Sequence, residues 1–284
     1  MTGHHDSTCW RFAAASVTGQ AHVEAGVACE DAWFCGQTDS GFAIGVVSDG
    51  AGSAAQGGYA AQQICAAFED ILADLNDLAD PTEHTPPSTI EPAAEAPAAG
   101  WSAVLGVVRD GIVRVRDALA RHAADHGNIP DDYLATLVCA VCHPAYGALV
   151  LHVGDGAATA FAPDGEALQT SQPENGEFLN QTYFLVEDEW EHHCRTSEVA
   201  PGSVGTVFLM TDGVTDLAYQ RDGRILRPAD GFFLPLREYL ENRSREEGER
   251  GLRGMLDTDR ARELVNDDKT ILWMNYAGNG EQGA

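Results

Sequence analysis

The sequence predicts an α+β fold in which antiparallel sheets are covered by helices. Short apolar or alternating runs recur along the chain, and several follow one another without an intervening helix, which favours antiparallel pairing. Long amphipathic helical patterns lie before residue 130 and must cover a sheet face. With 284 residues and 44% apolar content, the chain can bury a large core, so we expect a single domain over 1–284.

Seven segments have the composition of strands. Each is a short apolar or alternating run, the pattern of a strand that is buried on at least one face. The predicted strands are 11–17, 42–47, 135–141, 148–153, 157–161, 206–210 and 270–274.

Helical patterns occupy 54–75, 101–126 and 231–264. The second carries one apolar stripe, so it packs on something large, and a sheet is the obvious partner. The stripe consists of Val104, Val107, Val108, Ile112, Val115 and Leu119. Between the first two helices, 77–100 is rich in Pro, Ala, Thr and acidic residues without apolar periodicity, which predicts a mobile acidic, Pro-rich insertion.

The charge balance restricts the partners of this chain. Acidic residues outnumber basic ones 44 to 17, a formal net charge of −27, which disfavours nucleic acids and anionic membranes. No uncharged apolar stretch approaches the roughly 18 residues that span a bilayer, and the first residues lack the apolar core of a signal peptide. We therefore expect a cytoplasmic protein whose seven cysteines are reduced thiols.

Three apolar runs lead into an Asp-Gly pair, at Asp49, Asp155 and Asp212. An aspartate that leaves a buried strand is partly desolvated, and a following glycine allows a sharp turn or a close approach. Converging carboxylates repel one another and raise each other's pKa unless a cation neutralises them. Lys and Arg are scarce near these motifs, so a multivalent cation is the expected counter-charge.

Further acidic residues complete the set: Glu30 and Asp31 in ACEDAWF, Asp267 and Asp268 before a predicted strand, and Asp216 four residues after Asp212. All-oxygen ligands suit Mg²⁺ or Mn²⁺ rather than Zn²⁺. Two such ions about 3.5–4 Å apart can activate a water for displacement at phosphorus, which makes phosphate-ester hydrolysis the favoured chemistry.

The order of these motifs resembles that of the metal-dependent protein phosphatases known as protein phosphatase 2C, particularly the compact bacterial branch. The motifs are GVACEDA, SDGAGS, the segment 136–155, TDGVTD and DDKT, and together they span about 10–275. The resemblance implies a four-layer α/β/β/α sandwich of two antiparallel sheets flanked by helices. It also implies a signalling hydrolase that dephosphorylates serine and threonine, whose partners are phosphoproteins and a matching kinase or its target.

Residue roles follow from the resemblance alone. Asp49 would bridge two metals, with the Gly50 carbonyl as a further ligand, and Asp212 and Asp267 would complete one site, so Asp49, Asp212 and Asp267 are the expected catalytic residues. Asp268 is the alternative to Asp267. The other expected ligands are Glu30 and Asp31, through waters of the second metal, and Asp155 and Asp216, which with Asp212 would form a third site.

Two positions depart from the eukaryotic pattern. Gly26 replaces an arginine that binds the substrate phosphate, and Ala51 replaces a histidine acid, so both roles are unassigned. Arg11 and His22 lie on the segment before the acidic pair and are the available substitutes, although a surface arginine and a satisfied histidine are the plainer interpretations.

Several alternatives remain. A non-catalytic module of the same fold could sense phosphoproteins or metal, but no member of the acidic set is missing. A dinucleotide site at 50–55 lacks the parallel strand that should follow its helix. A zinc site at Cys139 and Cys142 would place its ligands on opposite faces of one strand. The long irregular region 164–203 is a candidate substrate-selecting flap.

Overall fold

Two five-stranded antiparallel sheets face each other in the computed structural model, which describes residues 10–78, 99–173, 182–223 and 225–278. The first sheet has the order β1 (Trp10–Val17), β12 (Lys269–Tyr276), β9 (Thr206–Met210), β6 (Ala157–Phe161) and β7 (Ala167–Ser171). The second has the order β2 (Asp31–Gln37), β3 (Ala43–Asp49), β4 (Leu137–His143), β5 (Gly147–Val153) and β8 (Arg195–Val199). A separate hairpin pairs β10 (Tyr219–Asp222) with β11 (Ile225–Pro228).

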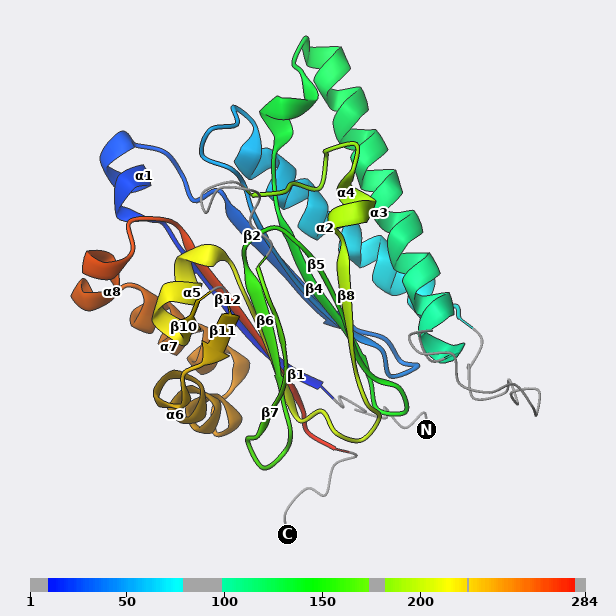
Figure 1. Cartoon of the computed structure of the whole chain (residues 1–284), viewed down its shortest axis with the longest axis vertical. Coiled ribbons are helices and arrows are strands. Elements are labelled where there is room, and N and C mark those ends of the chain that lie inside the picture. Colours follow the sequence, from blue (N-terminus) through cyan, green and yellow to red (C-terminus); the bar gives the residue numbers. More distant parts are fainter. Residues whose placement is uncertain (1–9, 79–98, 174–181, 224, 279–284) are drawn as a thin grey trace, which may run out of the picture.

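Helices form the two outer layers (Figure 1). On the second sheet lie α2 (Gly57–Asn76) and α3 (Ala99–His126), and on the first lie α6 (Asp230–Glu241) and α7 (Arg245–Leu256). The shorter elements are α1 (Gln20–Ala25), the 3-10 helix Pro130–Tyr133, α4 (Trp190–His193), α5 (Asp212–Ala218) and α8 (Asp259–Leu264). The predicted four-layer α/β/β/α architecture is confirmed.

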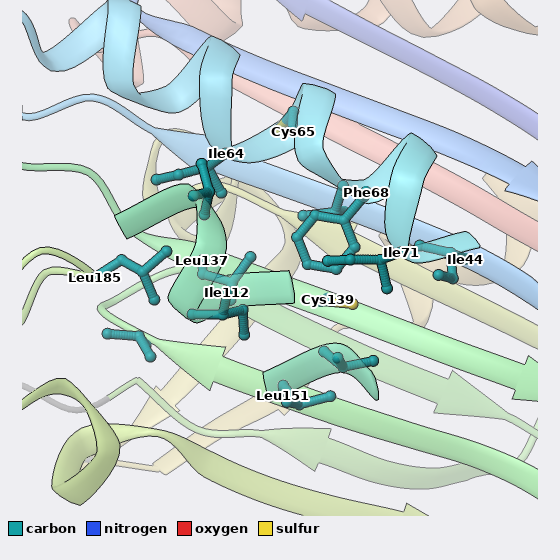
Figure 2. Close-up of a cluster of buried hydrophobic side chains, with 14 of the residues drawn as sticks. Ile44, Ile64, Cys65, Phe68, Ile71, Ile112, Leu137, Cys139, Leu151 and Leu185 are labelled. Atoms are coloured by element: carbon teal, nitrogen blue, oxygen red, sulfur yellow. The ribbon is translucent and has the colours of Figure 1, made fainter. Parts of the chain in front are cut away.

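Three apolar clusters fill the spaces between the four layers. The central strands are buried on both faces, so alternate residues of β4 enter different clusters: Cys139 packs toward the helices and Cys142 packs between the sheets. Figure 2 shows the helix-side cluster, in which Phe68 of α2 and Ile112 of α3 lie over the sheet residue Leu151. The opposite orientation of the two cysteines removes the zinc alternative at this pair.

All seven predicted strands are present, with ends that shift by up to two residues. The structure adds β2, β7, β8, β10 and β11, which are edge strands or a surface hairpin with polar sequences. The helical region 231–264 is divided into α6, α7 and α8. Of the predicted insertion 77–100, residues 79–98 lie outside the described residues. Among the described helices, none has the length and apolar content that a bilayer crossing requires.

Candidate metal centre

Three aspartates meet at one end of the sandwich, where strands of both sheets leave the core. Asp49 is the last residue of β3, Asp212 begins α5 directly after β9, and Asp155 follows β5. Each offers a carboxylate oxygen, and these oxygens lie within 4.8 Å of one another. The expected convergence of the three Asp-Gly motifs is therefore present in the fold.

The glycine after the aspartate permits a close backbone contact in all three motifs; a Cβ on Gly156 would lie 2.6 Å from the carbonyl oxygen of Met210. A Cβ on Gly213 would overlap the carbonyl oxygen of Asp268, and a Cβ on Gly50 would overlap the backbone of Gly57 at the start of α2. None of the three glycines has a positive φ, so the need for a glycine at these positions comes from the close approach of another backbone segment. At Asp212 the predicted turn is the first turn of α5.

Asp31 lies directly opposite Asp49 in the antiparallel register of β2 and β3 and is almost fully buried. The Thr211 hydroxyl donates a hydrogen bond to Asp31 Oδ2 at 2.9 Å. Asp31 Oδ1 and Asp212 Oδ1 are buried without a hydrogen-bond partner among the residues that the structure describes. Unpartnered carboxylate oxygens that face other carboxylates are what a hard cation would satisfy, so these residues fit a divalent metal.

Burial and mutual repulsion raise the pKa of every carboxylate at the centre of this site. Desolvation is the largest cause, and it raises the pKa of Asp31 to about 7 and that of Asp212 to about 8. The pKa of Asp49 is raised well above its ordinary value by burial and then by the charges of Asp31, Asp212 and Asp155. The pKa of Asp155 is also raised, again mainly by burial. Without a cation, the group holds protons at neutral pH.

The adjacent Asp267 and Asp268 have different environments. The buried Asp268 carboxylate accepts hydrogen bonds from the backbone N–H of Gly19 and of Glu30, each at 2.6 Å, and its Oδ2 lies 3.0 Å from His22 Nδ1. Asp267 is exposed, and its charge contributes to the raised pKa of Asp49, Asp155 and Asp212. Asp267 is thus the member of the pair that faces the cluster with oxygen capacity to spare.

Glu30 and His22 lie beside Asp268 at the edge of the site. His22 Nε2 is 3.6 Å from Glu30 Oε2, while His22 Nδ1 contacts Asp268. Burial lowers the pKa of His22, but the hydrogen bond to Asp268 and the charges of Asp268 and Glu30 outweigh that effect and raise it. Burial also raises the pKa of Glu30. The three side chains form one hydrogen-bonded and electrostatic group that fixes α1 next to the acidic cluster.

Asp216 lies outside the immediate cluster. It is one helical turn beyond Asp212 on α5, and its Oδ1 accepts hydrogen bonds from Nε and Nη2 of Arg221 at 3.3 and 3.0 Å. Asp155 accepts a hydrogen bond from the Thr182 hydroxyl. Thr182 belongs to the expected flap region 164–203, of which residues 174–181 lie outside the described part of the chain.

Arg11 does not lie near the acidic residues. It is at the far end of β1, where its guanidinium donates to the carbonyls of Leu240, Glu241 and Arg243 at the end of α6 and stacks over Trp273. The phosphate-binding role considered for it is wrong, because these carbonyls occupy the guanidinium and β1 meets the acidic residues through its opposite end, Val17, which pairs with Lys269.

The expectation that cations are scarce around the motifs is also wrong. Lys269, the only lysine of the chain, is fully buried directly after Asp268, and its Nζ donates to the carbonyls of Val265 and Asp267. The sequence contained the signal, because Lys269 belongs to the DDKT motif. Arg221 had no such signal, because the hairpin that carries it is polar and was not predicted.

The comparisons with known proteins agree with this geometry. The sequence profile described as protein phosphatase 2C matches residues 18–257. The chain belongs to the protein phosphatase 2C family. This membership confirms the expected class, a metal-dependent protein serine/threonine phosphatase, and an acidic cluster of the kind that such an enzyme needs is present.

Individual relatives match over nearly the full chain. The sequence is 26% identical over 277 residues to serine/threonine-protein phosphatase 3 of Escherichia coli (strain K12), covering 93% of this chain and 98% of that protein. Two solved structures of this phosphatase fold are similar. Serine/threonine phosphatase Stp1 of Staphylococcus aureus has a TM-score of 0.62 and 15% identity, with coverage of 98% and 100%. RsbX in complex with magnesium has a TM-score of 0.51 and 16% identity, with coverage of 96% and 98%.

Proposed function

We propose that this protein phosphatase 2C member hydrolyses phosphoserine and phosphothreonine on proteins, with water activated at a binuclear Mg²⁺ or Mn²⁺ centre. The observation that carries the proposal is the meeting of Asp49, Asp155 and Asp212, whose oxygens lie within 4.8 Å of one another. Family membership and the name of the Escherichia coli relative support the substrate class. The partners are then phosphoproteins, and we expect them to include a serine/threonine kinase or the target of such a kinase.

The proposed ligand roles combine the resemblance with the positions of the side chains. Asp49, which lies opposite Asp31 in the strand register and near Asp212 of α5, would be a ligand to both metals. Asp268 serves the framework, because both of its oxygens already accept hydrogen bonds or contact His22. The remaining proposed ligands are the Gly50 carbonyl, Asp212 and Asp267 at the binuclear centre, Glu30 and Asp31 through waters, and Asp155 and Asp216 at a third site.

Bound divalent cations would supply an activated water and would neutralise charge on the phosphate. The protein's own contribution is orientation. Thr211 holds Asp31 through a hydrogen bond of 2.9 Å, and the Thr136 hydroxyl accepts one from the Asp49 backbone N–H at 3.0 Å. These contacts fix the Asp31 carboxylate and the main chain at Asp49 before any ion arrives, which reduces the reorganisation that metal binding requires.

Hydrolysis of para-nitrophenyl phosphate and of a phosphothreonine peptide, with Mn²⁺, with Mg²⁺ and with a chelator, tests the proposal directly. We expect turnover only with a divalent cation. Anomalous diffraction from a Mn²⁺ soak would count the ions and name their ligands. A folded protein that binds the phosphopeptide but shows no metal-dependent turnover would instead be the binding module of this fold. The cytoplasmic location stays a prediction that cell fractionation can check.

A further inference from the structure

The β10–β11 hairpin carries an arginine beside the acidic cluster that the proposed chemistry has not used. Arg221 donates from Nε and Nη2 to the same oxygen of Asp216, and Asp216 is one turn along α5 from Asp212. Residues four apart on a helix lie on the same face, about 5–6 Å apart at Cβ. The guanidinium is therefore held within one side chain's length of the proposed metal ligands.

The hairpin is fixed in this place by contacts on both sides. The Tyr219 hydroxyl lies 2.8 Å from Thr159 Oγ1 of β6. The Gln172 amide bonds the backbone N–H and carbonyl of Leu226, at 2.6 and 3.1 Å. Arg195 in turn donates to the carbonyls of Gln172 and Gly154, the residue before Asp155. The charge of Arg221 accordingly lowers the pKa of Asp155, against the larger effect of burial.

We propose that Arg221 binds the phosphate oxygens of the phosphoserine or phosphothreonine substrate, the role that Gly26 leaves vacant. This inference rests on the proposed function, because it names a residue that would hold that reaction's substrate. A planar guanidinium can donate two parallel hydrogen bonds to a phosphate, a geometry that lysine cannot reproduce. Phosphate would approach once divalent cations compensate the carboxylates, which otherwise repel it.

The present partner of Arg221 does not prevent this role. The Arg221 and Asp216 side chains are 49% and 62% exposed, and exposed ion pairs contribute little to stability. Arg221 can therefore exchange Asp216 for a phosphate at small cost. If a cation binds Asp216, as proposed for the third site, the same event frees the guanidinium.

The hairpin also contains a matched control. Arg227 donates from Nε and Nη2 to one oxygen of Asp222 at 3.3 and 3.1 Å, with exposed fractions of 65% and 68%. Arg221 lies opposite Leu226 and Arg227 lies opposite Gln220, so the two arginines occupy opposite faces of the hairpin. Arg227 thus has the same ion-pair geometry without the neighbouring acidic cluster.

The test compares Arg221→Met, Arg221→Lys and Arg227→Met with the wild type, all loaded with Mg²⁺. Inorganic phosphate binding is measured by calorimetry and as competitive inhibition of phosphopeptide hydrolysis. We expect Arg221→Met to weaken phosphate binding and raise KM by about tenfold or more, and Arg221→Lys to recover only part of that loss. Mg²⁺ affinity should not weaken, and Arg227→Met should match the wild type.

Equal phosphate affinities of Arg221→Met and Arg227→Met would overturn the inference. A parallel loss of Mg²⁺ affinity in Arg221→Met would also overturn it, by showing that Arg221 only supports the metal site. Thermal unfolding identifies a misfolded variant, in which case Arg221→Lys decides the question. If the wild type shows no Mg²⁺-dependent turnover, the proposed function is refuted instead. The comparison of phosphate affinities would still test whether Arg221 binds phosphate.

Discussion

The carboxylate of Asp268 and the cluster of Asp31, Asp49 and Asp212 lie near each other in this protein and have opposite environments. Asp268 is buried, accepts hydrogen bonds from two backbone N–H groups and contacts His22. Asp31, Asp49 and Asp212 face one another, two of their oxygens lack a partner among the described residues, and the pKa of each is raised. The number of hydrogen-bond donors that face it therefore separates a structural carboxylate from a candidate metal ligand.

The distinction has an energetic basis. A buried carboxylate that accepts several N–H hydrogen bonds recovers much of the free energy lost on leaving water, so it stabilises the fold. Carboxylates that share a site without donors destabilise the fold until a cation or protons neutralise them. The same residue type therefore contributes to stability in one group and to metal binding in the other, and substitutions should affect the two properties separately.

The largest expected effect is on activity, from Asp49→Asn. The change keeps the size of the side chain and removes a charge that the proposed bridge requires. We expect turnover to fall by more than the roughly 10–100-fold that loss of a supporting outer-shell partner costs. Unfolding of the metal-free variant should need as much free energy as wild type or more, because repulsion is relieved. Steady-state kinetics and urea unfolding measure the two quantities.

Asp39→Asn is the control for that experiment, because Asp39 is an exposed aspartate in the loop between β2 and β3, at the other end of the same strand pair. It should behave as the wild type does. Metal-dependent turnover that survives in Asp49→Asn would contradict the assignment of the bridging ligand.

A smaller effect, on stability, is expected from Asp268→Ala. This change leaves the Gly19 and Glu30 N–H groups without their acceptor. We expect the free energy of unfolding of the metal-free protein to fall by about 3 kcal/mol, since hydrogen bonds to charged groups contribute about 1.5–3 kcal/mol each. Chemical denaturation measures this loss.

Asp267→Ala is the matched comparison for Asp268→Ala, because the two residues are adjacent and only Asp268 is buried. The Asp267 variant should keep its stability and lose Mg²⁺ affinity. The reverse outcome, a destabilised Asp267→Ala with normal metal binding, would show that the roles of the pair are exchanged.

The smallest expected effect is a pH dependence of the metal-free protein. The pKa values of Asp31 and Asp212, about 7 and about 8, lie above the ordinary 3.8, so the folded state binds more protons than the unfolded state between these limits. The free energy of unfolding should therefore fall as pH rises from 6 to 8, the range in which these two carboxyl groups lose their protons in the folded state.

Mg²⁺ provides the control for the pH experiment. A saturating cation takes the place of the protons, so this part of the pH dependence should disappear while every other titrating group contributes as before. Calorimetry in two buffers at pH 7 should also show proton release on Mg²⁺ binding. Parallel stability profiles with and without Mg²⁺ would contradict the raised pKa values.

The sequence was informative where a strand is buried on both faces. The apolar runs of β3, β4, β5 and β9 predict their own positions, and the aspartates at or just beyond the ends of such runs could be placed at one edge of the core. The edge strands β2, β7 and β8 were missed because they mix polar and apolar residues: β8 reads RTSEV and β2 reads DAWFCGQ, whereas the apolar edge strand β1 was predicted. Their pairing depends on a neighbouring strand far away in the sequence.

The sequence predicted which aspartates meet at the site but not how the contacts differ between neighbouring residues. The order of the motifs predicted that Asp49, Asp155 and Asp212 lie close together. The different roles of Asp267 and Asp268 depend on which of the two accepts hydrogen bonds from the N–H groups of Gly19 and Glu30. Those residues are more than 200 positions away in the chain. The same holds for Arg221, whose position depends on contacts of the hairpin with Gln172 and Thr159.

The glycine contacts at Gly50 and Gly213 have a consequence for how this protein tolerates change. Because backbone packs directly on backbone at both places, main-chain contacts hold the residues that directly follow Asp49 and Asp212. Conservative exchanges in the layer between the sheets should therefore alter thermal resistance without moving the ligands. A library of variants with substitutions confined to that layer should contain proteins that are more thermostable and keep the same arrangement of ligands.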